Sequence, residues 1–469
     1  MANTDTPRPP SSATSGTPNL TRRDVLKGIA GVAGVASVPT LLAACGTGAS
    51  PSAAPSSAAP SGAPSVAPSS AAPIGGITLG SNYSDQVPKD AMQAIADAFT
   101  KETGLTVKIN TVDHGTFQDQ ISSYLGGRPD DVFTWFSGYR MRFFAAQGLA
   151  TPIDDVWAKV GSNYSDAFKV GSTGDDGHQY FIPIYNYPWA VFYRKSLFQE
   201  KGYTIPATLD ELKALGDKMK RDGLIPIAFG DKDGWPAMGT FDILNLRLNG
   251  YDFHVGLMAG KEKWTDPRVK TVFQTWNDLL PYHQEGAPGR TWQDAAQALV
   301  QKKAGMYLLG MFVSQQFKAS SEADLADLDF FPFPNLGTPY DAEKALDAPI
   351  DGFMIAKNSP TLAQDLDGAK AFMEFLAQGS TQIIFVTADP GNVAAAKDAD
   401  TSGYNPLQKK AVELIGSAQK ITQFLDRDTR PDFAGANGMQ SFLLDFLKTP
   451  DQDLDAFLGK IQGFWDTLV

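Results

Sequence analysis

Apolar positions follow two different periods along the chain from residue 77 onward. Positions that alternate between apolar and polar predict strands at 77–79, 105–109, 131–136, 224–229 and 306–309. Apolar positions three and four residues apart predict helices at 90–103, 140–147, 208–223, 266–281, 292–303, 362–378, 437–447 and 450–468. Because strands and helices follow each other in turn, the pattern predicts an α/β fold.

The pattern over residues 180–195 predicts a strand, which two prolines, Pro183 and Pro188, interrupt. The polar and aromatic residues around these prolines are Tyr185, Asn186, Tyr187 and Trp189. Flat rings beside an amide suit a ligand with polar edges and apolar faces, and a broken strand suits a hinge. A strand packed in a core explains the same pattern, so both interpretations stay open.

The N-terminal segment has the features of an export signal. Arg22 and Arg23 form a twin-arginine pair, and an uncharged apolar run covers residues 28–44. The run is short and rich in Gly and Ala for a membrane span, which needs about 17 to 25 apolar residues. Residues 42–45 resemble the lipobox of bacterial lipoproteins. We therefore predict a signal peptide over 1–45 and a lipid anchor on Cys45 at the outer face of the cell membrane.

Composition changes sharply after this segment. Residues 46–76 are dominated by Ala, Ser, Pro and Gly, a composition that cannot bury a core and predicts an extended linker. The chain has one cysteine, so no intramolecular disulfide is expected.

The net charge and the placement of the histidines argue against two kinds of site. The formal net charge is −12 and no basic stripe offsets it, which argues against binding of nucleic acid. The four histidines are scattered and have no cysteine partner, so no metal site is expected. No cofactor is expected either.

Several motifs occur in a fixed order in the rest of the chain. They are the segments 128–135, 147–149, 177–195, 208–212, 223–228, 303–310 and 352–359. In this order, and behind a lipoprotein signal, the chain resembles the extracellular solute-binding proteins of bacterial ABC importers, in the sugar-binding group that includes the maltose-binding proteins.

The resemblance implies a two-lobed α/β fold of the periplasmic-binding-protein type (type II), with hinge strands between the lobes and the ligand in the cleft. The expected first lobe covers 77–186 and 330–386, and the expected second lobe covers 188–329 and 388–469. The expected function is to capture a sugar or oligosaccharide outside the cytoplasm and deliver it to the permease subunits of an ABC transporter. We expect a monomer without catalytic residues.

A sugar has a polar rim and two C–H faces, so aromatic rings beside short polar groups are the expected lining. The predicted ligand-binding residues are Ser84, Asp85, Trp135, Phe136, Ser137, Tyr139, Tyr187, Trp189, Asp233, Trp235, Phe312, Asp351 and Gly352. Ser137 follows the strand 131–136, and open α/β sheets bind ligands at the carboxyl ends of their strands. Side chains alternate across a strand, so one of Trp135 and Phe136 faces the cleft, and the resemblance favours Phe136.

Three alternatives remain at this stage, and one of them is a purely structural surface module. The first is a binding protein for another ligand, such as a polyamine, iron or a phosphate-containing compound. The second is an exported glycosidase that uses paired carboxylates, although no spacing of Asp and Glu singles out a pair. The identity of the sugar is not encoded in any motif.

Overall fold

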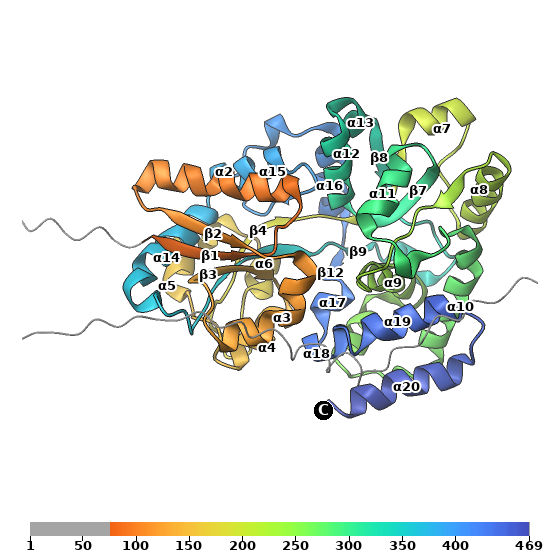
Figure 1. Ribbon diagram of the computed structural model, residues 1–469. Helices are drawn as coiled ribbons and strands as arrows, with labels where there is room; N and C mark the ends of the chain where they lie inside the picture. Colours follow the sequence, from red (N-terminus) through yellow and green to blue (C-terminus); the bar gives the residue numbers. More distant parts are fainter. Residues whose placement is uncertain (1–75, 469) are drawn as a thin grey trace, which may run out of the picture. The chain divides into compact units, whose positions relative to one another are not determined.

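Two β-sheets organise the chain in a computed structural model that describes residues 76–468 (Figure 1). The first sheet contains β1 (Ile77–Ser81), β2 (Val107–Thr111), β3 (Val132–Phe136), β4 (Ile182–Asn186), β10 (Ile350–Ile355) and β11 (Val393–Ala394). The second sheet contains β5 (Trp189–Arg194), β6 (Ile225–Ile227), β7 (Ala304–Gly310) and β8 (Leu328–Phe331). Cys45, the twin arginines and nearly all of the predicted linker lie outside the described residues, so the predictions made for them are untested.

The first sheet has the strand order β11-β4-β10-β3-β1-β2. Strand β1 is parallel to β2 and β3, whereas β10 is antiparallel to both β3 and β4. Pro183, inside β4, lies opposite Gly352, directly beside a shift of register between Asp351 and Gly352. A proline cannot donate a ladder hydrogen bond, and the irregular pairing here accommodates it.

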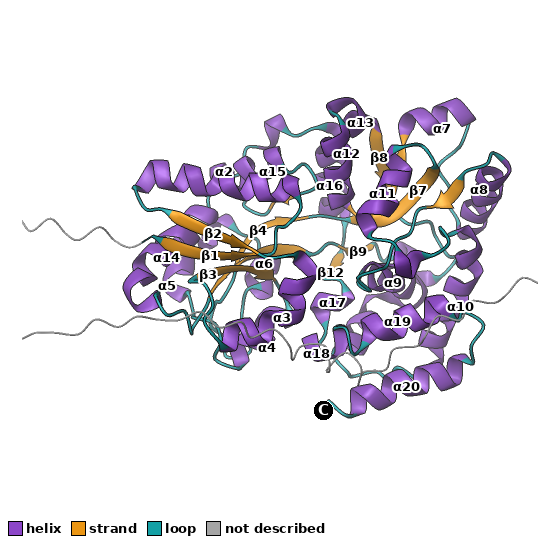
Figure 2. Cartoon of the chain, viewed as in Figure 1, coloured by secondary structure: helices purple, strands orange, loops and turns teal. Residues whose placement is uncertain are grey.

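Helices cover both faces of the first sheet (Figures 1 and 2). They are α2 (Gln86–Thr103), α3 (His114–Gly126), α4 (Tyr139–Ala146), α5 (Asp154–Val160), α6 (Asp166–Gly171), α14 (Leu362–Leu376) and α15 (Gly379–Ala388). Phe99 of α2 packs on Phe372 of α14 in the core of one face. Trp135 of β3 packs on Phe117 and Phe144 in a separate cluster on the other face.

The second sheet has the order β6-β7-β5-β8, and β9 (Ala345–Asp347) pairs with β12 (Lys420–Thr422) in a parallel two-stranded sheet. The helices of this part are α7 (Lys195–Lys201), α8 (Leu209–Arg221), α9 (Pro236–Met258), α10 (Pro267–Leu279), α11 (Trp292–Val300), α12 (Ser314–Ser320), α13 (Glu322–Asp327), α16 (Pro406–Ser417), α17 (Leu425–Asp428), α18 (Pro431–Ala434), α19 (Met439–Lys448) and α20 (Leu454–Asp466).

The chain passes from the first sheet to the second between β4 and β5, through Tyr187 and Pro188. It returns between β8 and β10, and β11 is the last strand of the first sheet along the chain. Residues 180–195 are therefore two strands in two sheets, joined at the break that Pro188 predicts. The exact residue bounds of the two lobes stay a prediction.

Most predicted elements agree with the structure to within one turn, and three differences stand out. Helix α2 begins at Gln86 and not at residue 90, and β2 lies at Val107–Thr111 and not at 105–109. Helix α9 is buried on nearly all sides, so it carries no amphipathic stripe from which the sequence could have predicted it.

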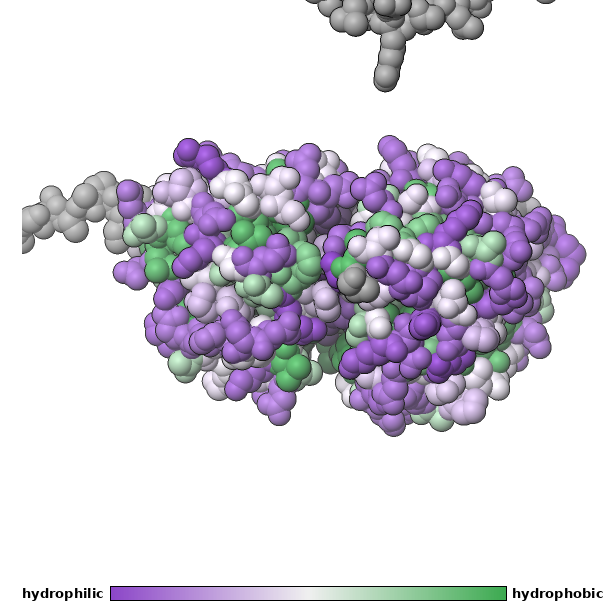
Figure 3. Space-filling view, turned by 90° about the horizontal axis from the view of Figure 1, so that it is seen from below, coloured by the Kyte–Doolittle hydropathy of each residue, from purple (hydrophilic) through white to green (hydrophobic). Residues whose placement is uncertain are grey.

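Hydrophobic residues lie in small groups among hydrophilic ones on the face seen in Figure 3. Large exposed apolar side chains are scattered along the described chain, at Val112, Val170, Ile205, Tyr340 and Val412. Among residues 76–468, no helix combines the length and apolar character required to cross a membrane.

Candidate functional site

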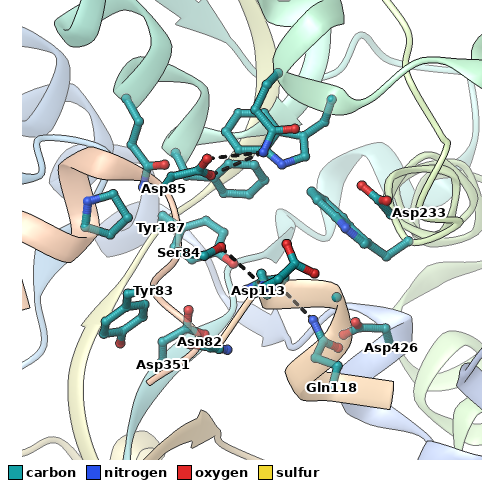
Figure 4. Close-up of a pocket in the computed structure, with 18 of the residues that line it drawn as sticks. Asn82, Tyr83, Ser84, Asp85, Asp113, Gln118, Tyr187, Asp233, Asp351 and Asp426 are labelled. Carbon is teal, nitrogen blue, oxygen red and sulfur yellow. Dashed lines mark hydrogen bonds between the residues drawn. The ribbon is translucent and has the colours of Figure 1, made fainter. Parts of the chain in front are cut away.

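A cavity of about 170 Å³ lies between segments that come from both sheets (Figure 4). Its aromatic lining consists of Tyr83, His114, Tyr185, Tyr187, Trp235, Trp292, Phe312 and Phe424. Its charged lining consists of Asp85, Asp113, Asp233, Asp351, Asp426 and Arg427. Its amide lining consists of Asn82, Gln118, Gln293, Gln315 and Asn392. Rings beside many donors and acceptors suit a small, polar, ring-shaped ligand.

The topology of the first sheet places Asp351 at the floor of the cavity. Strand β10 lies between β3 and β4, so Asp351 pairs with Phe136 on one side and Tyr185 on the other. The Tyr185 hydroxyl donates to Asp351 Oδ2 at 3.1 Å, and Arg427 donates from Nη1 to Oδ1. Burial raises the pKa of Asp351, while Arg427 and Tyr185 oppose that shift.

Arg427 crosses from the short helix α17, which packs against both α9 and α4. Its guanidinium lies 3.9 Å from the centre of the Phe136 ring and 5.4 Å from that of Phe424. Burial alone lowers the pKa of Arg427, but Asp351, Tyr187, Asp426 and Tyr185 together outweigh burial and the pKa is raised. The arginine is therefore charged at any pH at which the protein is folded.

Two buried polar atoms at this floor form an ion pair with each other but have no hydrogen-bond partner among the described residues. They are Nε of Arg427 and Oδ1 of Asp426, which lie 3.6 Å apart. The first is a donor and the second an acceptor, and both residues line the cavity. A ligand with neighbouring hydroxyl groups could satisfy both atoms at once.

A chain of hydrogen bonds fixes the state of His114. Arg140 donates from Nη1 to Gln118 Oε1 at 2.6 Å, so the other end of the Gln118 amide is the donor to His114 Nε2 at 2.7 Å. His114 Nε2 is therefore the unprotonated nitrogen of a neutral ring. Burial lowers the pKa of His114 to about 4, and Arg427 adds to this shift.

Trp235 stands in the aromatic wall because of the loop before α9. Gly234 adopts a φ of 74°, and the buried Asp231 accepts the backbone N–H of Ala237 at 2.8 Å at the start of the helix. The Trp235 ring centre lies 5.7 Å from that of Phe312 and 6.4 Å from that of His114.

Side-chain hydrogen bonds join the first-sheet side of the cavity to the second-sheet side, and the bond from Arg427 to Asp351 described above is one of them. Gln293 of α11 donates from Nε2 to Asp85, at 3.3 Å from each carboxylate oxygen. Together with the contact between His114 and Trp235, this bond holds the two sides of the cavity against each other.

Seven of the thirteen predicted residues line the cavity, namely Ser84, Asp85, Tyr187, Asp233, Trp235, Phe312 and Asp351. Ser84 also supports its neighbour, because its Oγ accepts the backbone N–H of His114 at 3.2 Å. Direct ligand contact stays a prediction for every member of this set.

The other six predicted residues, Trp135, Phe136, Ser137, Tyr139, Trp189 and Gly352, do not line the cavity. Trp135 packs into the core beneath β3, and Phe136 lies under the guanidinium of Arg427. Ser137 Oγ donates to the Gly171 carbonyl at 2.8 Å, and Trp189 packs on Phe424.

The remaining two of these six residues are Tyr139 and Gly352. Tyr139 is the first residue of α4. Gly352 is needed where two strands approach, because a Cβ there would lie 2.0 Å from the Ile182 carbonyl oxygen.

Several cavity residues were missing from the sequence prediction. They are Asn82, Tyr83, Asp113, His114, Gln118, Trp292, Gln293, Gln315, Asn392, Phe424, Asp426 and Arg427. Tyr185, which the sequence analysis names beside Pro183, also lines the cavity. Asn82 and Tyr83 follow β1 directly, so the strand-end rule could have found them. Asp426 and Arg427 have no such signal, because a four-residue helix far along the chain brings them to the site. In the described part of the chain, no group of three or more His, Cys, Asp or Glu side chains is arranged to hold a metal ion.

Comparisons with known proteins agree with this geometry. The family model described as bacterial extracellular solute-binding protein matches residues 84–382. The crystal structure of the bacterial solute receptor AcbH is 47% identical, with a TM-score of 0.80, and covers 84% of this chain and 99% of its own. AcbH is described as having an exclusive substrate preference for β-D-galactopyranose.

Two further relatives bind other solutes. The alpha-glucosides-binding periplasmic protein AglE of Rhizobium meliloti (strain 1021) is 26% identical over 396 residues, which is 79% of this chain and 82% of AglE. A chitin oligosaccharide binding protein has the same fold, with a TM-score of 0.74 at 21% identity over 84% of this chain and 98% of its own.

Proposed function

We propose a ligand for this chain, which belongs to the family of bacterial extracellular solute-binding proteins. Its cavity binds a single hexopyranose and prefers D-galactopyranose to other hexoses. The chain is the substrate-binding component of an ABC transporter for sugars, with the two-lobed α/β fold of that family.

The likeness to AcbH carries this proposal, because that receptor is 47% identical over 84% of this chain and is described as having an exclusive substrate preference for β-D-galactopyranose. The cavity has a volume of about 170 Å³, and the hydrogen bond from Gln293 to Asp85 crosses it.

The chemistry of the lining supports a pyranose. Tyr187, Trp235 and Phe312 supply rings for the C–H faces, and Asp351, Asp426 and Arg427 supply charged partners for the hydroxyl groups. The likeness to AcbH, which is described as preferring β-D-galactopyranose, supports galactose as the first sugar to test.

We further infer that the protein is a receptor without catalytic activity. The seven predicted residues that line the cavity contact the sugar. Closure follows rotation about the crossings near Tyr187 and Pro188, with lobes close to 77–186 plus 330–386 and 188–329 plus 388–469. A sugar that touches both lobes favours the closed form, because its affinity differs between the two forms.

We infer that the receptor is a monomer at the outer face of the membrane. A lipid on Cys45 and the linker hold it close to the permease. The lipobox-like residues 42–45 support this lipid anchor. The variant Cys45→Ser should be exported but should leave the membrane fraction. Unchanged membrane fractionation of this variant would contradict the lipid anchor.

Calorimetric titration of the full chain carrying Cys45→Ser tests the ligand proposal. D-galactose should bind with a stoichiometry of one and should raise the melting temperature. D-glucose and maltose should bind at least tenfold more weakly. Tighter binding of maltose than of any hexose would show that the ligand is an oligosaccharide, and no binding of any sugar would overturn the proposal.

A further inference from the structure

A buried carboxylate that does not line the cavity lies at the turn between α15 and β11. Asp389 directly follows α15, and its side chain is fully buried. Its Oδ1 accepts the backbone N–H of Gly391 at 3.1 Å, and its Oδ2 accepts a hydrogen bond from Nε2 of Gln315 at 2.8 Å. Gln315 does line the cavity. Asp389 can therefore act on a ligand through the amide of Gln315.

The bond to Asp389 fixes which end of the Gln315 amide is free. A glutamine amide has a donor end and an acceptor end, whereas an ionised carboxylate only accepts. Nε2 must therefore face Asp389, and Oε1 is the end left for a ligand. None of the described residues donates a hydrogen bond to Oε1, and Gln315 is only 7% exposed. An acceptor in such a place costs binding free energy when the ligand offers it no hydrogen.

Close packing keeps the two side chains together. A Cβ at Gly391 would lie 2.8 Å from Cα of Phe312 and 3.1 Å from Oγ of Ser314. The turn at 389–391 therefore lies directly against the segment that leads into α12, and only glycine allows this approach. Asp389 follows a helix of the first-sheet part, whereas Gln315 belongs to α12 in the second-sheet part. Their bond thus joins the two sides of the cavity.

Asp389 is ionised at neutral pH, but a modest fall in pH protonates it. Burial raises the pKa of Asp389 to about 6, and the bonds from Gly391 and Gln315 oppose this shift. The cation that acts on Asp389 is Lys318 of α12, whose Nζ donates to the Thr387 carbonyl at 3.4 Å. The charge of Asp389 also reaches Tyr83, whose pKa is raised well above its ordinary value, mainly by burial, so this phenol stays neutral.

Protonation of Asp389 reverses the Gln315 amide. Oδ1 accepts the Gly391 N–H, so the added proton resides on Oδ2 and points at Gln315. The amide then turns Oε1 toward Asp389 and leaves Nε2 for the ligand. The free end of Gln315 thus changes from an acceptor to a donor.

We propose that Asp389 is a positioning residue for the sugar, because it holds Gln315 with Oε1 free to accept a hydrogen from one hydroxyl group of the ligand. This inference rests on the proposed function and names the residue pair that sets one point of its specificity. A sugar hydroxyl satisfies Oε1, whereas a fluorine on the same carbon has no hydrogen to donate. When Asp389 loses its charge, the amide reverses and the fluorine faces a donor.

The test compares D-galactose with analogues in which fluorine replaces each hydroxyl group in turn. Each sugar is titrated by calorimetry at pH 7.5 into the full chain carrying Cys45→Ser. The fluorine penalty is the factor by which an analogue binds more weakly than galactose. At the position that contacts Gln315, this penalty should be at least fivefold, because Oε1 is left without a hydrogen.

Two variants assign this penalty to the pair. In Asp389→Asn, Oδ1 still accepts the Gly391 N–H and Nδ2 faces Gln315, so the amide reverses and the penalty should fall at least fivefold at that one position. Gln315→Met keeps the length of the side chain without an amide and should lose the same penalty. Asp367→Asn, at an exposed position on α14, makes the same change of charge and should leave every penalty as in the wild type.

The pH dependence gives the same readout without a substitution at Asp389. In the wild type, the penalty at this position should shrink between pH 7.5 and pH 5, because Asp389 gains a proton. In Gln315→Met it should not change with pH. Burial also raises the pKa of Asp85, Asp233 and Asp351, so the effect is taken as the difference between these two proteins.

The outcomes separate this inference from the proposed function. If Asp389→Asn weakens galactose and all analogues by one common factor, Asp389 supports only the fold and the positioning role is wrong. If Gln315→Met keeps every wild-type penalty, Gln315 is not the acceptor and the inference also fails. Should Asp389→Asn not fold, the pH series and Gln315→Met decide. If neither galactose nor any analogue binds the wild type, the proposed function fails and this inference fails with it.

Discussion

Removing Arg427 should destabilise the protein through the carboxylate that it leaves behind. In Arg427→Met, a side chain of similar length keeps the contacts with Phe136 and Phe424, but Asp351 loses the cation that it contacts. Asp351 is only 6% exposed, so water cannot replace the guanidinium. Breaking a buried ion pair in this way costs about 3 to 5 kcal/mol of unfolding free energy.

Thermal unfolding measures this loss. For a folded body of this size, 1 kcal/mol corresponds to roughly 1 to 2 °C, so the melting temperature should fall by about 3 to 10 °C. Adding Asp351→Asn removes the stranded charge and should restore most of the melting temperature. The double variant should still bind galactose at least tenfold more weakly, because the guanidinium donor is absent.

The pH dependence gives an independent check. Burial already raises the pKa of Asp351, and loss of Arg427 raises it further above the value in the unfolded chain. A carboxyl whose folded pKa is raised destabilises the fold when ionised, and this destabilisation disappears as the pH falls through the folded pKa. The deficit of Arg427→Met relative to wild type should therefore be smaller at pH 5 than at pH 7.5.

Two results would refute this reasoning. An equal deficit at both pH values would mean that the Asp351 carboxylate is not the cause. A double variant no more stable than Arg427→Met would locate the loss in packing around Phe136 and Phe424.

Three further predictions test the walls of the cavity. Trp235→Ala should weaken galactose binding by about 1.5 to 3 kcal/mol in calorimetry and lower stability less, whereas an equal loss of both would make Trp235 a core residue. Gln293→Ala should weaken binding about two- to tenfold and shift small-angle scattering toward an open form, while Gln297→Ala, on the same helix but bonded to Gln316, should do neither. Burial lowers the pKa of His114, so the unfolded chain binds a proton that the folded protein does not, and the free energy of unfolding should fall from pH 6.5 toward pH 4. His114→Gln should make this fall shallower. An unchanged slope would contradict the buried neutral ring.

The local sequence determined the class of fold and most of its elements. Period and capping residues placed helices such as α8, where Thr208 accepts the backbone N–H of Glu211 at 3.3 Å, and Pro188 marked the break between β4 and β5. These features are local, since they depend on hydrogen bonds and backbone angles within a few residues. The ordered motifs then predicted the two-lobed family, which the comparisons confirm.

Only the tertiary structure decided which of these residues share a cavity. Asp351 reaches the floor because β10 lies between β3 and β4, and Arg427 meets it from a helix 76 residues further along the chain. Alternation along β3 predicts that one of Trp135 and Phe136 faces the cavity. In the structure neither side chain lines it, because Arg427, from a distant segment, covers Phe136. Helix α9 shows the same limit, since burial on nearly all sides removes the periodic pattern that sequence analysis requires. Local interactions leave their mark in neighbouring residues, whereas pairing between distant segments is set by packing and by the cost of burying charge, which no short stretch of sequence records.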